Sequence, residues 1–191
     1  MDKIEFLKSV IKENNEIQKN LESSFENIIR ISEKIADCLH NNGCVFLCGN
    51  GGSAADAQHV SAEFIGRFNK NRKALAAEAL TTNSSILTAI SNDYSFEDVF
   101  SRQVEARVKK EDIVVGISTS GKSKNVINAL LKAKKIKITT IGFTGNKSNE
   151  MNDVCDFLIQ VPSEKTSRIQ ENHIMIWHMI CELIEQNIEK I

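Results

Sequence analysis

Short apolar runs alternate with segments of helical length along most of this chain, and no other feature limits its possible folds as much. Strands that alternate with helices pair in parallel, and the helices then cover both faces of the sheet. The sequence therefore predicts an α/β three-layer sandwich built on a five-stranded parallel sheet. The expected strands are Cys44–Cys48, Ala74–Leu80, Ile113–Ile117, Ile138–Phe143 and Phe157–Val161.

Helical periodicity marks both ends of the chain. From residue 2 to about residue 42, apolar residues recur at three- and four-residue intervals, and the pattern is interrupted near residues 20–23, which predicts two helices. A second helical pattern runs from Thr166 to about Lys190. A small sheet cannot cover all these helices, so we expect an oligomer. We expect a single domain over 1–191, with 1–42 as a helical pair for oligomerisation and 43–191 as the α/β core.

Composition limits the class of partner and the compartment. A chain of 191 residues suits one full core. The 24 basic and 25 acidic residues give a net charge of -1, which does not favour binding to nucleic acid or to an anionic membrane. No apolar run approaches the length of a membrane span. The five cysteines form no C-x-x-C pair, so we expect a reduced, cytoplasmic protein whose partner is a small molecule.

Two strands are followed by turns of similar chemistry. CGNGGS combines glycines, which allow a tight turn, with Ser53 at the start of the next helix, and GISTSGKS supplies four hydroxyl groups before another helix. Helix N-termini and hydroxyl groups suit a phosphate. Neither segment fits the P-loop pattern, and the third glycine of the dinucleotide pattern is replaced by Ala54. The alternative interpretation is that both segments are only strand-to-helix turns.

Polar side chains on two predicted helices could supply the chemistry. His59 and Glu63 are four residues apart, so both lie on one face of a helix and could bind a cation or act on one substrate atom. Gln170 and His178 lie on a similar stripe of the C-terminal helix, and His173 lies off it. A surface pairing for His59 and Glu63, and a core position for His178, are the alternatives.

A third polar segment, AISND, is expected to place Asn92 and Asp93 in a turn before a helix.

These motifs together resemble the sugar isomerase (SIS) domain family and, within it, the bacterial phosphoheptose isomerases. The segments CGNGGSAADAQH, AISND, GISTSGKS and RIQENHIMIWHMICELIE match in order and spacing over nearly the whole chain. The resemblance implies the SIS fold, with a flavodoxin-like strand order. It also implies a homotetramer with active sites at subunit interfaces.

The implied activity is the conversion of sedoheptulose 7-phosphate to D-glycero-D-manno-heptose 7-phosphate through a cis-enediol. This aldose–ketose isomerisation leads into the ADP-heptose pathway of lipopolysaccharide and surface-glycan biosynthesis. The resemblance makes Glu63 and His178 the catalytic pair, and makes His59, Glu63, Gln170 and His178 ligands of Zn²⁺. The implied substrate-binding residues are Asn50, Gly51, Gly52, Ser53, Glu63, Asn92, Asp93, Ser118, Thr119, Ser120, Ser123 and Gln170.

Two alternatives come from the same resemblance. A bacterial protein that binds a replication initiator is similar over the whole chain but lacks the acid/base pair that Glu63 and His178 provide here. Other SIS proteins isomerise pentose or hexosamine phosphates, although they usually carry further domains. The residues do not separate a catalytic role for zinc from an organising one, because ligation and base catalysis use the same lone pairs of Glu63.

Overall fold

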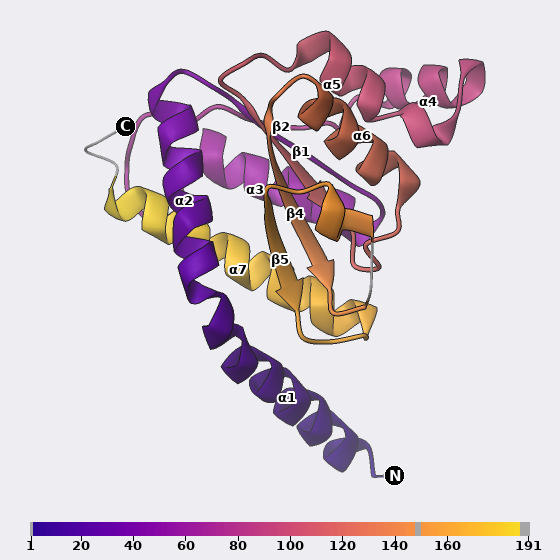
Figure 1. The fold of residues 1–191 in the computed structure, drawn as a ribbon. Coiled ribbons are helices and arrows are strands. Elements are labelled where there is room, and N and C mark those ends of the chain that lie inside the picture. Colours follow the sequence, from indigo (N-terminus) through magenta and orange to yellow (C-terminus); the bar gives the residue numbers. More distant parts are fainter. Residues whose placement is uncertain (1, 148–149, 188–191) are drawn as a thin grey trace.

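A five-stranded parallel sheet forms the centre of the protein. The computed structural model describes residues 2–147 and 150–187, and Figure 1 shows the sheet with helices on both sides. The strand order is β2-β1-β3-β4-β5, so both the predicted fold and the flavodoxin-like order are confirmed. The strands are β1 (Val45–Gly49), β2 (Ala77–Ala79), β3 (Ile113–Ile117), β4 (Thr139–Gly145) and β5 (Phe157–Val161).

The edge strand β2 is shorter than expected. The sequence predicted a strand over 74–80, whereas only Ala77–Ala79 pair with β1. Ala76 still accepts from the N–H of Val45 in β1, but the backbone N–H of Leu75 donates to the carbonyl of Phe64 at the end of a helix, so the chain leaves the sheet there. The strand β4 is longer than expected at its C-terminal end, because it extends past the predicted Phe143 to Gly145.

Alternate strand residues point to opposite faces and build two apolar layers. Leu47 and Val115 pack with α2, α3 and α7 on one face, and Phe46 and Val114 pack with α5 and α6 on the other. The helices of the sandwich are α2 (Phe25–His40), α3 (Gly52–Ile65), α4 (Ser84–Asp93), α5 (Ser101–Arg107), α6 (Lys124–Lys135) and α7 (Thr166–Gln186), and the short 3₁₀ helices η2 (Phe96–Asp98) and η3 (Glu150–Asp153) join them.

The N-terminal helices occur as predicted. Helix α1 (Lys3–Asn20) is separated from α2 by the 3₁₀ turn η1 (Leu21–Ser24), which matches the expected break. Figure 1 shows α1 extending away from the sheet. Its last part joins the core through Ile17, whereas its first three turns expose large apolar side chains. These exposed residues, called here the α1 apolar face, are Ile4, Phe6, Leu7 and Ile11.

Helix α7 crosses one face of the sheet. It begins at Thr166 as predicted, and its expected end near Lys190 lies outside the described residues. In residues 2–147 and 150–187, no helix combines the length and the apolar character needed to cross a membrane.

One histidine of α7 is part of the core. His173 is fully buried, its Nε2 lies 3.2 Å from the carbonyl oxygen of Thr144, and its ring meets the edge of Phe143. Burial disfavours the charged imidazole and lowers the pKa of His173 to about 4, although the bond to Thr144 acts in the opposite direction. The folded protein therefore holds this histidine neutral.

This histidine predicts a pH dependence of stability. Between about pH 6.5 and pH 4 the unfolded chain binds a proton at His173 that the folded protein does not, so the free energy of unfolding falls as pH falls. The loss should reach about 1.4 kcal/mol per pH unit and about 3 kcal/mol in total. His173→Gln should remove this part of the loss, as measured by urea unfolding across this window.

Ile176→Val is the matched control for that experiment. It removes one buried methyl group from the same helix, costs about 1 kcal/mol at every pH and leaves the slope unchanged. A His173→Gln protein with the wild-type slope would contradict the assignment.

Candidate active site

The first predicted phosphate turn connects β1 to α3. Gly51 has a φ of 55°, a conformation that glycine adopts readily and other residues rarely. A Cβ at Gly52 would lie 1.7 Å from Nε2 of Gln170, so the absence of a side chain leaves room for that amide. Ser53 is buried in the first turn of α3. The turn thus joins β1, α3 and α7 at one point.

The second turn connects β3 to α6 and gathers hydroxyl groups. Ser118 Oγ donates to Ser123 Oγ over 2.9 Å and lies 3.5 Å from Ser120 Oγ. The backbone N–H of Lys122 donates to Ser120 Oγ over 3.2 Å. Thr119 lies between them, and its carbonyl accepts from the N–H of Gly145. Three of the four predicted hydroxyls therefore converge at the N-terminus of α6.

A reciprocal amide pair ties the two turns together. Asn50 Nδ2 donates to Asn125 Oδ1 over 2.8 Å, and Asn125 Nδ2 donates to Asn50 Oδ1 over 2.9 Å. The last residues of the two strands, Gly49 and Ile117, are paired in register, so both turns leave the sheet at the same level. Asn125 is buried and was not identified from the sequence, because nothing local distinguishes it from any other helical asparagine.

A second cluster lies further along α3, against α7. His59 Nε2 is 3.0 Å from Glu63 Oε1, and His178 Nε2 is 3.3 Å from His59 Nε2. The ring of Phe68 also packs against His178, with centroids 5.2 Å apart. The cluster is partly open to solvent, since the side chain of Glu63 is 26% exposed. The structure thus brings together three of the four predicted metal ligands, including both predicted catalytic residues.

The donor atoms of this cluster can be compared with what zinc requires. Tetrahedral ligands about 2.0–2.1 Å from zinc lie about 3.3–3.4 Å from one another, and imidazole nitrogen and carboxylate oxygen are ordinary zinc ligands. His59 Nε2 is shared by both contacts, however, and in the part of the chain that the structure describes no three His, Cys, Asp or Glu side chains form a group able to hold a metal. His59, Glu63 and His178 therefore fit zinc in the type of their donor atoms and in the distances between neighbouring pairs. Their three donor atoms are not arranged around a single metal position.

The fourth predicted ligand, Gln170, lies apart from this cluster. It precedes His178 by eight residues in α7, which corresponds to about 12 Å along the helix axis. Its amide lies against Gly52, at the phosphate turn. In this structure the Gln170 amide therefore lies at Gly52 and the His178 imidazole lies at His59, so Gln170 is not part of the second cluster.

The expected turn at Asn92 and Asp93 is wrong. These residues are the last two of α4, where the helical pattern of SSILTAISND continues to its end. Asn92 Nδ2 donates to Asp93 Oδ1 over 2.9 Å, and both side chains are exposed. Figure 1 shows α4 at the edge of the molecule, beyond α5 and α6.

One carboxylate near the cluster was not identified from the sequence. Asp56 lies three residues before His59 and seven before Glu63, so the three share one stripe of α3. Its Oδ2 is buried and has no hydrogen-bond partner among the described residues. Burial raises the pKa of Asp56 to about 6, and the nearby His59 lowers it in part. The spacing DAQHVSAE contained this signal.

Comparison with known proteins places the chain in a family. Residues 7–145 match the model of the SIS domain. The chain is 52% identical to phosphoheptose isomerase 1 of Campylobacter jejuni over 84% of its own length and 86% of the relative's.

Two solved structures agree over nearly the full length of the chain. A phosphoheptose isomerase from Neisseria gonorrhoeae is 42% identical with a TM-score of 0.90, and the alignment covers 95% of this chain and 98% of that one. A phosphoheptose isomerase from Francisella tularensis is 31% identical with a TM-score of 0.93, covering 97% and 100%. This chain therefore belongs to the SIS domain family and, within it, to the phosphoheptose isomerases.

Proposed function

We propose that the protein is an aldose–ketose isomerase that interconverts sedoheptulose 7-phosphate and D-glycero-D-manno-heptose 7-phosphate. The observation that carries this proposal is the contact of His59 with both Glu63 and His178, in a chain that belongs to the phosphoheptose isomerases. It supports the isomerase over the initiator-binding alternative, because that similar protein lacks the acid/base pair.

The two turns are the proposed phosphate site. Ser53, Ser118, Thr119, Ser120 and Ser123 would donate hydroxyl hydrogen bonds, and the first N–H groups of α3 and α6 would favour the dianion. Asn50, Gly51 and Gly52 would contact the sugar. The Asn50 side-chain amide is bonded to Asn125, and its carbonyl accepts from the N–H of Ser53, so Asn50 holds the turn in shape around a ligand.

Glu63 is the proposed base for the reacting carbons. Its carboxylate would remove a proton from C1 of the ketose while the oxygen at C2 takes up a proton, which gives the cis-enediol. Return of the proton to C2 and loss of the proton at the C1 oxygen give the aldose. His178 would move the proton between the two oxygens, because its imidazole nitrogen can donate and accept in turn.

His59, Glu63 and His178 would hold Zn²⁺, with Gln170 as the fourth ligand. When bound, zinc would act as a Lewis acid that polarises the carbonyl group, or would fix the orientation of its protein ligands.

The proposed assembly is a homotetramer with active sites at subunit interfaces. Two features support it. The α1 apolar face is exposed on the isolated chain, and contiguous exposed apolar surface is typical of subunit contacts. Within this chain Gln170 is not part of the second cluster, and a neighbouring subunit would supply it. Asn92 and Asp93, which lie on α4, would also reach a sugar bound at such an interface.

We further propose a cytoplasmic enzyme of the ADP-heptose pathway, which feeds lipopolysaccharide and surface-glycan heptose. The cysteines of the described residues are free, which supports a reducing compartment.

Two matched variants separate chemistry from binding. Glu63→Gln should fold and bind substrate but lower kcat by about 10²–10⁴-fold, because it removes the base. Ser120→Ala should mainly raise KM, because a phosphate contact stabilises substrate and transition state alike. Conversion of sedoheptulose 7-phosphate by purified protein is the assay. Near-normal kcat in Glu63→Gln would remove Glu63 as the base, and an unchanged KM in Ser120→Ala would remove the phosphate assignment.

The zinc proposal is tested by metal content and by turnover. We expect purified protein to contain zinc by mass spectrometry, chelation to abolish turnover and added Zn²⁺ to restore it. His59→Gln should lose the metal, whereas Ser120→Ala should retain it. Full activity in metal-free wild-type protein would contradict a role for zinc in the reaction.

The assembly is tested on α1. Charges introduced together by Ile4→Asp, Leu7→Asp and Ile11→Asp should reduce the tetramer to smaller species in light scattering and lower turnover in parallel. Ser9→Asp adds one negative charge on the side of α1 opposite Ile4, Leu7 and Ile11 and should leave the mass unchanged. A tetramer in both variants would show that the α1 apolar face is not an interface.

A further inference from the structure

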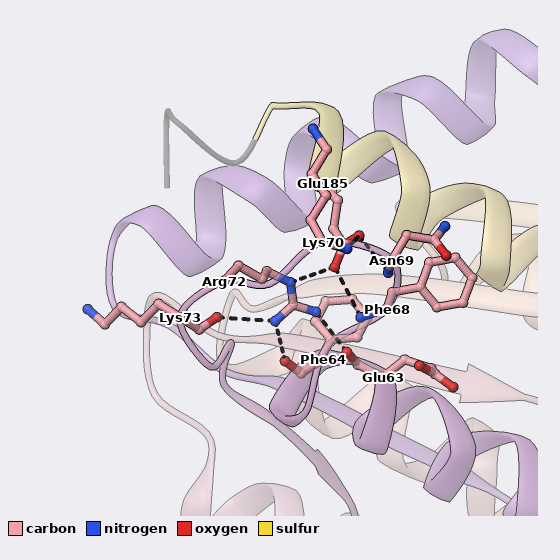
Figure 2. Close-up of polar contacts among 8 residues, drawn as sticks. All are labelled: Glu63, Phe64, Phe68, Asn69, Lys70, Arg72, Lys73 and Glu185. Atoms are coloured by element: carbon pink, nitrogen blue, oxygen red, sulfur yellow. Dashed lines mark hydrogen bonds and ion pairs between the residues drawn. The ribbon is translucent and has the colours of Figure 1, made fainter.

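A buried carboxylate near the end of α7 organises the segment that follows α3. Glu185 accepts hydrogen bonds from the backbone N–H groups of Phe68 over 3.0 Å, Asn69 over 2.8 Å and Lys70 over 2.8 Å. Figure 2 shows these three groups directed at the carboxylate. The fourth donor is Nε of Arg72, at 2.9 Å. One side chain of α7 therefore fixes the path of residues 68–72.

Arg72 connects this carboxylate to the end of α3. Its Nη2 donates to the carbonyl of Glu63 over 2.7 Å, and its Nη1 donates to the carbonyl of Phe64 over 2.8 Å. The last carbonyls of a helix have no partner within the helix. The guanidinium supplies a bond to the Glu63 carbonyl and adds a second bond to the Phe64 carbonyl, which also accepts from the N–H of Leu75. Figure 2 shows the guanidinium between Glu185 and the final turn of α3.

The charges of this pair are held in the protein interior. The side chains of Arg72 and Glu185 are 4% and 3% exposed. Burial by itself would raise the pKa of the Glu185 carboxyl, but the three backbone N–H donors and Arg72 lower it below its ordinary value. Removal of either partner would leave a buried charge without compensation.

The pair contacts the backbone of Glu63 directly and reaches His178 through one intermediate residue. Glu63 is reached through its own carbonyl, which accepts from Arg72. His178 is reached through Phe68, whose N–H donates to Glu185 and whose ring lies 5.2 Å from the His178 ring at an interplanar angle of 35°. The rest of the site, the two phosphate turns, lies at the opposite end of α3.

We propose that Arg72 and Glu185 are positioning residues of the isomerase: together they set where Glu63 and His178 stand relative to each other. This inference rests on the proposed function. Neither side chain is free to touch the substrate, because their polar atoms are used by α3 and by residues 68–70. The pair should therefore act on the geometry of proton transfer and not on the binding of the phosphate.

Arg72→Lys is the decisive variant. It keeps a cation beside Glu185, so the buried carboxylate retains a partner, but an ammonium group cannot bond Glu185 and two helix carbonyls at once. We expect kcat to fall by about tenfold or more with KM within about twofold of wild type, since small displacements of catalytic groups act on the chemical step.

Arg107→Lys is the matched control. Arg107 also pairs with a glutamate, Glu78, but it lies on α5, which packs on the face of the sheet opposite to α3 and α7. It should leave kcat and KM unchanged. A wild-type kcat in Arg72→Lys would overturn the inference.

A spectroscopic readout separates this inference from the proposed function. In ¹³C-histidine-labelled protein, the His178 ring signals, assigned with His178→Gln, should shift in Arg72→Lys because the Phe68 ring moves, and should not shift in Arg107→Lys. If the wild-type protein shows no isomerase turnover but the His178 signals still shift in Arg72→Lys, the coupling would be supported and the proposed function would fail. Unchanged His178 signals in Arg72→Lys would overturn the coupling, whatever the activity.

Discussion

The parallel pairing of β1 with β3 is the constraint on which the rest of the site depends. Because their last residues, Gly49 and Ile117, are in register, the chain leaves the sheet twice at the same level and enters a helix both times. The N-termini of α3 and α6, which are the positive ends of the two helix dipoles, therefore point to one region. The reciprocal bonds of Asn50 and Asn125 hold the two turns at a fixed separation. An anion site follows from sheet topology before any particular ligand is considered.

The second constraint is that α3 and α7 run side by side in the same direction. Along α7, Gln170 contacts the start of α3 at Gly52, and His178 contacts the middle of α3 at His59. Glu185 then contacts the segment that follows α3. The contacts therefore occur in the same order along both helices. This arrangement spreads polar groups over the length of a helix, whereas a metal or a sugar needs them near one point. The proposed tetramer would let neighbouring subunits bring such distant positions together.

The sequence predicted features that depend on local pattern and missed those that depend on distant contacts. Strand positions, the two phosphate turns and the pairing of His59 with Glu63 follow from periodicity and spacing within short segments. Arg72 and Glu185 have no such signal, since the groups they join are more than a hundred residues apart along the chain. The short β2 has the same origin, because Leu75 bonds to the end of α3. Asn92 and Asp93 were misjudged because polar residues also end helices.

The pair formed by Arg72 and Glu185 explains how a partly exposed carboxylate can be held in place. A buried ion pair adds little net stability compared with apolar side chains of the same volume, because desolvation offsets the attraction. Apolar side chains could not bond the three N–H groups or the Glu63 carbonyl, and these groups would lose the partners that the pair supplies. The pair therefore fixes directions more than it adds stability. Its bonds define where α3 ends and where Phe68 lies, and thereby hold Glu63 and His178 while their own side chains remain free to exchange protons.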